Sequence, residues 1–282
     1  MPSRFGEDPF IIREPAETVE RIKRFLRTHL ERIGARCLVV GMSGGLDSSV
    51  TAALCSQALG GKKVLGFCLP EAQTGNEKNI EDAKQVATKF GVIFKILDLT
   101  PLTKTALNTV PQWKKESKIP IGNLKARLRA MILYYYANIN NGLVVGTGDK
   151  SEITLGYFTK YGDGACDIQP LADLYKTSVR DLARHLGLPK RIVSKPSSPE
   201  LWPGQTAEGE LGLGYGKLDW ILWGLERWML PQEIAAELGL SVSLVERVRN
   251  RWLASEHKRR PPLTVKLGFR TAGQDLRIPY SL

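Results

Sequence analysis

Apolar positions recur every three or four residues in the first long segment of the chain, residues 17–33, and Lys and Arg residues stand between them. This spacing predicts an amphipathic helix, which Gly34 ends. A different pattern follows at 37–41, where Cys-Leu-Val-Val-Gly is a short, continuous apolar run. Such runs are typical of strands that are covered on both faces of a sheet. The pattern therefore predicts a helix followed by a buried strand.

The alternation of short apolar runs with helical spacing continues along the chain. Runs at 63–69, 92–99 and 143–146 predict strands, whereas 50–59, 76–90 and a long stretch before residue 143 have helical spacing. Strands that alternate with helices in this way are typical of a parallel sheet. We therefore expect an α/β fold with a doubly wound parallel sheet flanked by helices, joined by right-handed crossovers.

The pattern changes after residue 190. Pro and Gly residues in 190–216 predict a long loop with little regular structure, of the kind that covers or binds a substrate. Residues 217–260 again have helical spacing, and 269–282 predicts a tail or an edge element. We expect a single domain over 1–282, made of an N-terminal helix in 1–36, an α/β core in 37–189, the substrate loop in 190–216, and a C-terminal helical region and tail in 217–282.

Composition and charge narrow the class of protein. A hydrophobic share of 43% and a mean hydropathy of -0.18 are ordinary for a globular chain. No apolar run approaches the roughly 18 residues that span a bilayer, and residues 1–14 lack the apolar centre of a secretory signal, so we expect a cytoplasmic protein without a membrane partner. The four cysteines form no C-x-x-C pair, which argues against a zinc or disulfide framework. The net charge of +11 attracts polyanions, either nucleic acid or a phosphorylated small molecule.

The clearest chemical signal is the sequence Ser-Gly-Gly-Leu-Asp-Ser at 43–48, between the first strand and the next helix. Two glycines permit positive φ, so consecutive N–H groups can surround phosphate oxygens beside the positive end of the helix dipole. We expect this loop to hold a pyrophosphate, with Asp47 as a Mg²⁺ ligand because a bare carboxylate would repel phosphate. The Walker lysine and the dinucleotide G-x-G-x-x-G spacing are both missing. The alternative is a tight turn with a capping aspartate, but the flanking serines favour a binding loop.

This loop resembles that of the N-type ATP pyrophosphatases, which cleave ATP to AMP and pyrophosphate and have an adenine nucleotide alpha-hydrolase-like fold. Further segments are similar to one family of that group, the ammonia-dependent NAD synthetases. These segments are N-L-K-A-R-L-R at 123–129, G-T-G-D-K-S-E at 146–152, G-Y-F-T-K-Y-G-D-G at 156–164, D-L-Y-K at 173–176, L-W-P-G-Q at 201–205, E-G-E-L-G at 208–212 and H-K-R-R at 257–260. They occur in the family's order over nearly the whole chain.

The resemblance implies an enzyme that converts deamido-NAD (nicotinic acid adenine dinucleotide), ATP and ammonia to NAD, AMP and diphosphate, the last step of NAD biosynthesis. It also implies that Asp47 and Glu152 bind Mg²⁺. The residues it assigns to ATP are Gly41, Met42, Ser43, Gly44, Gly45, Leu46, Asp47, Ser48, Thr147, Lys176 and Ser198. Those it assigns to deamido-NAD are Arg127, Lys160, Asp167, His257 and Lys258.

Several of these positions suit the chemistry on physical grounds. Thr147 and Glu152 follow the end of a predicted strand, where open α/β sheets gather their ligands. A lysine such as Lys176 suits the negative charge that builds up when phosphorus is attacked. Arg127 and Arg129 lie on opposite sides of the long helix, so only one is expected to face the substrate; the resemblance favours Arg127, and Arg129 is then expected on a solvated face.

The implied mechanism has two steps. The nicotinate carboxylate attacks the α-phosphorus of ATP while diphosphate leaves into the 43–48 loop, and ammonia then attacks the acyl-adenylate and expels AMP. Asp47 and Lys176 are the expected catalytic residues, and Asp163 is a candidate to accept a proton from ammonium because burial in a closing loop would raise its pKa. Residues 1–36 are too few for an amidase domain, so free ammonia is the expected nitrogen source unless a separate subunit supplies it.

Three other interpretations compete with this one. Residues 231–251 have the pattern of a helix-turn-helix, but the arginines of its second helix cannot share one face, which favours a structural helix pair over DNA binding. A tRNA-modifying ATP pyrophosphatase would also be basic, but its thiolating branch generally carries paired cysteines. A non-catalytic nucleotide-binding module would not need Asp47, Glu152 and Lys176 together.

Members of the resembled family are homodimers, and one helix offers a compatible surface. Residues 123–138 have a broad apolar face that includes Met131, Ile132 and Tyr135. Packing on the sheet would explain the same face, and the sequence does not choose between the two.

Overall fold

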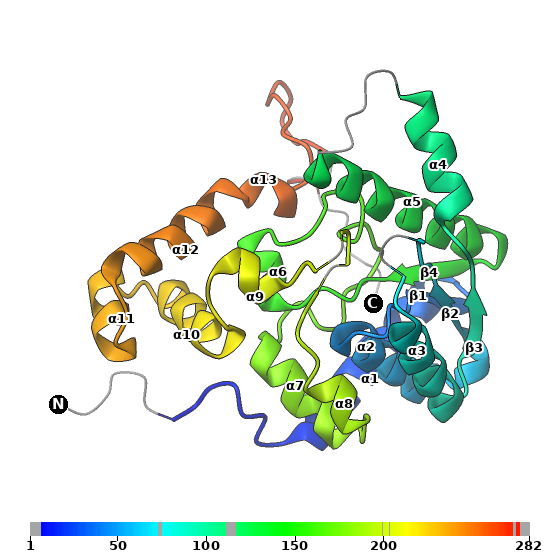
Figure 1. Ribbon diagram of the computed structural model, residues 1–282, viewed down its shortest axis with the longest axis horizontal. Coiled ribbons are helices and arrows are strands. Elements are labelled where there is room, and N and C mark those ends of the chain that lie inside the picture. The colour runs from blue at the N-terminus through cyan, green and yellow to red at the C-terminus, as the bar shows by residue number, and fades with distance from the viewer. Residues whose placement is uncertain are drawn as a thin grey trace.

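Four parallel strands form the centre of the computed structural model in Figure 1, which describes residues 7–72, 75–110, 117–198, 200–202, 204–272 and 275–276. The strands are β1 (Cys37–Gly41), β2 (Val64–Cys68), β3 (Ile93–Ile96) and β4 (Gly142–Val145), in the spatial order β3-β2-β1-β4. Val39 of β1 lies opposite Leu65 of β2 on one side and opposite Val144 of β4 on the other. The predicted parallel α/β sheet is confirmed.

Helices cover both faces of the sheet because the side chains of β1 alternate between two hydrophobic cores. Leu38 and Val40 pack on one side, whereas Cys37 and Val39 pack on the other. The first side is covered by α1 (Pro15–Ile33), α2 (Leu46–Leu59), α3 (Glu77–Phe90), α7 (Lys176–His185) and α8 (Lys190–Val193). The second side is covered by α5 (Lys118–Ile139), against which α4 (Thr100–Thr109) packs. Burial on both faces explains why the strands are continuous apolar runs.

The strand order reverses between β1 and β4, which identifies the edge of the sheet where ligands are expected. The chain places β2 and β3 on one side of β1 and then returns to its other side with β4. In open α/β sheets such a reversal opens a crevice outside the carboxyl ends of the two strands. Residues 42–45 follow β1 and lead into α2, and residues 146–149 follow β4 and lead into α6 (Lys150–Leu155). A short turn of 3-10 helix, η1 (Gly61–Lys63), connects α2 to β2.

The segment 190–216 is more regular than the sequence suggested. It contains α8 and α9 (Ala207–Leu211), which are short, and among the described residues between them there is no helix or strand. Pro189, directly before this segment, is the N-cap of α8, and Gly212, with φ 69°, follows α9. Thr206 caps α9 by accepting a hydrogen bond from the backbone N–H of Gly209. One proline and one glycine therefore mark ends of these short helices.

The C-terminal helices build a third hydrophobic core at one side of the sheet (Figure 1). They are α10 (Tyr215–Glu226), α11 (Pro231–Leu238), α12 (Val242–Ala254) and α13 (Glu256–Arg259). The helix pair at 231–251 is α11 and α12, joined at Gly239, and its apolar residues Ile234, Val245 and Val248 face this core. Much of the tail expected at 269–282 lies outside the described residues. Within the described part of the chain, no helix is both long and apolar enough to cross a bilayer.

Candidate functional site

The loop after β1 forms a tight turn against α3. Gly44 has a φ of 79°, and a Cβ atom at this position would lie 2.0 Å from the carbonyl oxygen of Asn79. Both observations require glycine, since other residues disfavour this φ and the contact leaves no space for a side chain. Lys195 also fixes the turn by donating from Nζ to the carbonyl oxygen of Gly44 at 2.8 Å. The chain thus approaches the start of α2 along a path that side chains would obstruct.

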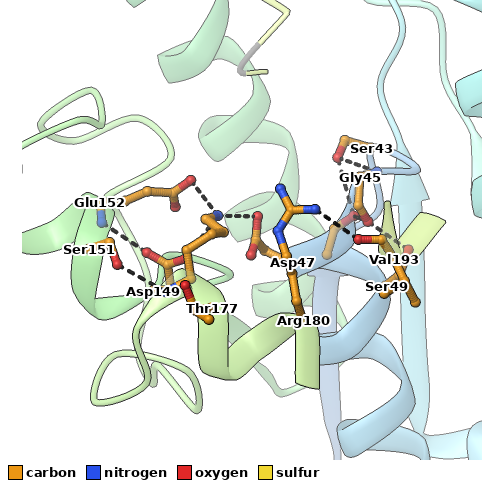
Figure 2. Close-up of polar contacts among 12 residues, drawn as sticks. Ser43, Gly45, Asp47, Ser49, Asp149, Ser151, Glu152, Thr177, Arg180 and Val193 are labelled. Carbon is orange, nitrogen blue, oxygen red and sulfur yellow. Dashed lines mark hydrogen bonds and ion pairs between the residues drawn. The ribbon is translucent and has the colours of Figure 1, made fainter. Parts of the chain in front are cut away.

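Three serine hydroxyls surround the start of α2. The Oγ atoms of Ser43 and Ser48 are 3.2 Å apart, and Ser49 donates from Oγ to the carbonyl oxygen of Gly45 at 2.7 Å (Figure 2). The N-cap residue Gly45 has no side chain, so no side-chain cap occupies this helix end. Backbone N–H groups in the first turn of a helix have no intrahelical partner and carry positive partial charge. The loop therefore has the geometry of an anion site.

A buried lysine lies beside this helix end, among three carboxylates. Lys176, the first residue of α7, is completely buried, and its Nζ atom lies 2.7 Å from Oδ2 of Asp47, 2.8 Å from Oδ2 of Asp149 and 2.8 Å from Oε1 of Glu152. Figure 2 shows the three carboxylates converging from α2 and α6. Tyr215 closes the remaining side, with its ring centroid 5.2 Å from the ammonium. We call Asp47, Asp149, Glu152 and Lys176 the acidic cluster.

Burial controls the ionisation of the acidic cluster. Desolvation raises the pKa of Asp149 to about 7 even though Lys176 opposes this shift, and desolvation likewise raises the pKa of Glu152 well above its usual range. For Lys176 burial alone would lower the pKa, but the surrounding carboxylates outweigh it and raise the pKa well above the usual range. The lysine therefore stays charged at neutral pH, while the carboxyl groups of Asp149 and Glu152 compete for protons.

The acidic cluster can supply some of the ligands of a divalent cation, but not a complete set. Oδ1 of Asp47 is buried and has no hydrogen-bond partner, and the ammonium of Lys176 shows that a cation fits between Asp47 and Glu152. No set of three or more His, Cys, Asp or Glu residues in the described ranges is arranged to hold a metal by itself. Mg²⁺ commonly binds one or two carboxylates and completes its shell with water and substrate phosphates. The residues present fit that kind of site.

A cavity of about 250 Å³ opens at the edge where β1 and β4 end. It lies between the 43–48 loop, the end of β4 and residues 195–198 and 200–201. Most of the predicted ATP-binding residues line it, namely Gly41, Met42, Ser43, Gly45, Leu46, Asp47, Ser48, Thr147 and Ser198. Gly44 shapes the loop from behind, and Lys176 lies behind the carboxylates of Asp47 and Glu152. The structure thus brings the ATP set together around one cavity and one buried lysine.

The predicted dinucleotide residues are outside this cavity lining. Arg127 is exposed and donates to the carbonyl oxygen of Lys160 at 3.3 Å, and Lys160 donates from Nζ to the carbonyl oxygen of His257 at 2.7 Å. These three residues form one surface group. Asp167 accepts hydrogen bonds from the backbone N–H of Val144 and from Tyr134, so it ties the 166–168 segment to β4 and α5.

Lys258 contacts the turn after α6. Its Nζ atom donates at 2.7 Å to the carbonyl oxygens of Gly156 and Phe158, and desolvation lowers its pKa. The adjacent Arg259 donates to the last carbonyl oxygens of α6, at Ile153 and Thr154. The two basic residues thereby hold the segment that continues to Lys160 and Asp163.

Asp163, the candidate proton acceptor, lies in the cavity wall. Its Oδ1 atom accepts a hydrogen bond from the backbone N–H of Thr159 at 2.8 Å. Asp163 is exposed as a whole residue, yet desolvation raises the pKa of its carboxyl group. A carboxylate with a raised pKa is a better proton acceptor at neutral pH than an ordinary one.

Several cavity and cluster residues were not predicted from the sequence, among them Arg129, Lys195 and Asp149. Arg129 lines the cavity and donates from Nε to the carbonyl oxygen of Leu69, so the expectation that it lies on a solvated face is wrong. Lys195 lines the cavity beside the 43–48 loop, and Asp149 is completely buried in the acidic cluster. Asp149 also caps α6 by accepting from the N–H of Glu152, and its place three residues before Glu152 is the sequence signal that would have revealed it.

Comparisons with known proteins agree over almost the whole chain. The NAD synthase family model matches residues 18–262. The NH(3)-dependent NAD(+) synthetase of Aeropyrum pernix is 46% identical over 252 residues, which are 88% of this chain and 88% of that protein. Among solved structures, NMN synthetase from Francisella tularensis has a TM-score of 0.79 and 31% identity over 90% of this chain and 99% of its own. NH3-dependent NAD synthetase from Campylobacter jejuni has a TM-score of 0.74 and 28% identity over 89% and 99%. Every predicted site residue lies within the matched range.

Proposed function

The chain belongs to the NAD synthase family, and we propose that it catalyses the ATP-dependent amidation of deamido-NAD with ammonia, giving NAD, AMP and diphosphate. The observation that carries this proposal is the position of the 43–48 loop, which lines one cavity together with Glu152 at the end of β1 and β4, while Lys176 lies buried directly behind Asp47 and Glu152. Such an arrangement joins an anion site for the departing diphosphate to charges that stabilise the reacting phosphate.

The first step is formation of the acyl-adenylate. The nicotinate carboxylate attacks the α-phosphorus of ATP, the bond from that phosphorus to the bridging oxygen breaks, and diphosphate leaves into the loop. Ser43 and Ser48 donate hydrogen bonds there, together with the backbone N–H groups that begin α2. Lys176 provides a permanently charged ammonium next to the reacting centre, where negative charge increases in the transition state.

The second step is attack of ammonia on the acyl carbon. AMP leaves, and the nitrogen loses a proton as the amide forms. Asp163 is the proposed proton acceptor because it lies in the cavity wall and desolvation raises its pKa. The names of the relatives specify ammonia, and we propose free ammonia as the nitrogen source here too.

Asp47 and Glu152 are the proposed ligands of a Mg²⁺ ion that accompanies ATP. When bound, such an ion would neutralise charge on the phosphates. The unpartnered Oδ1 of Asp47 supports this assignment, as does the cation already held between the two carboxylates.

The dinucleotide site and a homodimer belong to the same proposal. Arg127, Lys160 and His257 form a surface group that a second copy of the chain could complete. Helix α5, which carries Arg127, also exposes Met131 and Tyr135 on its outer face, whereas Leu128 is buried against the protein. Exposed apolar side chains in a row are typical of subunit contacts.

We further propose a cytoplasmic location, in keeping with four unpaired cysteines.

An assay of NAD formation tests the proposal. Purified protein receives ATP, Mg²⁺ and deamido-NAD, with ammonium or glutamine as the nitrogen source, and the products are separated by chromatography. The expected products are NAD, AMP and diphosphate with ammonium. Because one structural neighbour is an NMN synthetase, a parallel reaction offers deamido-NMN as the acid. Release of ADP and phosphate, or amidation of the mononucleotide alone, would contradict the proposal.

A further inference from the structure

Helix α10 carries two carboxylates on the side that faces the proposed active site. Asp219 and Glu226 are seven residues apart, which is about two turns of helix and places them on one face. Both contact the starts of α6 and α7, the helices that carry Glu152 and Lys176. We propose that Asp219 is a positioning residue that fixes the start of α7, and thereby the Lys176 ammonium, relative to Asp47 and Glu152. This inference rests on the proposed function.

Asp219 uses both carboxylate oxygens. It is completely buried, and its Oδ1 atom accepts a hydrogen bond from Oγ of Ser151 at 2.6 Å. Its Oδ2 atom accepts from the backbone N–H of Thr177 at 2.8 Å and from Oγ1 of Thr177 at 2.7 Å. Three donors from two other helices therefore converge on one side chain that touches none of the acidic cluster carboxylates.

These contacts fix the backbone next to the catalytic lysine. Ser151 donates to Asp219 and accepts, at 3.0 Å, from the backbone N–H of Lys176. The N-cap residue of α7, Tyr175, makes no side-chain cap. The otherwise unpaired N–H groups of Lys176 and Thr177 are thus satisfied by Ser151 and Asp219, so α10 provides the cap that the sequence of α7 lacks.

Glu226 makes a second contact with the same two segments. It accepts from Nζ of Lys150 at 2.9 Å and from the hydroxyl of Tyr175. Lys150 and Tyr175 directly precede Ser151 and Lys176 in the chain. Glu226 is half-buried, however, so its contacts compete with water and are expected to be the weaker of the two.

Position matters at Lys176 because its ammonium contacts three carboxylates at 2.7 to 2.8 Å. A shift of α7 by about 1 Å would break at least one of these contacts, and misplacements of that size typically slow catalysis by about 100-fold. Asp219 is itself outside the cavity lining, so its loss removes no side chain that lines the cavity.

The test compares three variants with one control in the full-length protein. Asp219→Ala removes the cap, Asp219→Asn keeps its shape but can accept at only one atom, and Ser151→Ala removes the link to the N–H of Lys176. Ser241→Ala is the matched control, because Ser241 caps α12 by accepting from the N–H of Leu244 and lies outside the cavity lining. For each protein the melting temperature, kcat, and KM for ATP and deamido-NAD are measured.

We expect Asp219→Ala to lower kcat by about 100-fold, and Ser151→Ala and Asp219→Asn by about 10-fold, with KM for deamido-NAD changed by less than about 3-fold. The control should lower the melting temperature without changing kcat. If Asp219→Ala does not fold, Ser151→Ala decides: an unchanged kcat would overturn the inference, as would a folded Asp219→Ala with wild-type kcat. Failure of the wild type to form NAD would instead refute the proposed function.

Discussion

Replacement of Lys176 by methionine removes the single cation of the acidic cluster while keeping a side chain of similar length. The three carboxylates of Asp47, Asp149 and Glu152 would remain without their common partner. Removal of one partner from a buried ion pair typically costs about 3–5 kcal/mol, because an uncompensated charge stays buried. For a chain of this size about 1 kcal/mol corresponds to roughly 2–4 °C, so Lys176→Met should lower the melting temperature by roughly 6–20 °C at neutral pH.

The pH dependence of this loss follows from the raised carboxyl pKa values. Asp149, with a pKa raised to about 7, and Glu152, raised well above its usual range, hold protons at pH values where the unfolded chain has released them. A group with a raised pKa stabilises the folded state below its unfolded pKa, and this contribution is lost as the pH rises through the folded pKa. The loss of melting temperature caused by Lys176→Met should therefore be small near pH 4–5 and should grow as the pH rises through 7.

Catalysis gives the second measurement on the same variant. Loss of one preorganised charge at a reacting centre typically lowers kcat by about 10²–10³-fold. Exchange of labelled diphosphate into ATP, in the presence of deamido-NAD, reports on the first step alone, and binding of deamido-NAD is followed separately. Lys23→Met is the control, since Lys23 pairs with Glu20 at the surface. Exchange at the wild-type rate, or a stability deficit that does not change with pH, would refute the reasoning.

Three further predictions concern the loop, the proposed metal ligand and the proposed subunit contact. Gly44→Ala should raise KM for ATP at least 10-fold and lower the melting temperature, because the new Cβ would meet Asn79 and the φ of 79° is unfavourable for alanine; unchanged values of both would refute the packing argument. Asp47→Asn should abolish turnover and weaken Mg²⁺-dependent ATP binding measured by calorimetry, while circular dichroism stays unchanged. Tyr135→Glu should shift a dimer to a monomer in light scattering, because Tyr135 is 61% exposed on α5; an unchanged mass would place the contact elsewhere.

The fold could be predicted from the sequence where its cause is local. The run at 37–41 coincides with β1, and the long amphipathic segment ends with α1 at Ile33. Helix α2 begins at Leu46, earlier than the helical spacing suggested, because Gly45 serves as its N-cap. Short helices were missed at 190–216, since a helix of four or five residues has too few positions for a periodic pattern to appear.

Only those parts of the candidate site whose residues are adjacent in the sequence could be predicted. The 43–48 loop carries its glycines, serines and aspartate in one segment, so spacing alone indicated an anion site. Arg129 was misplaced because helical spacing shows that it and Arg127 point in different directions but not which direction faces the cavity. Asp219 could not be found this way, because it contacts residues 42 and 68 positions away and only the packing of α10 brings them together.

The acidic cluster also explains why the proposal pairs ATP with a cation. When its four groups are ionised, three carboxylates and one ammonium leave an excess of two negative charges beside the loop. Like charges about 4 Å apart repel by roughly 4 kcal/mol near a protein surface, so a bare triphosphate would be opposed here. Protons on Asp149 and Glu152 can remove part of this excess, as their raised pKa values indicate. A divalent ion between Asp47 and Glu152 would remove the rest, so the nucleotide and its ion are expected to bind together.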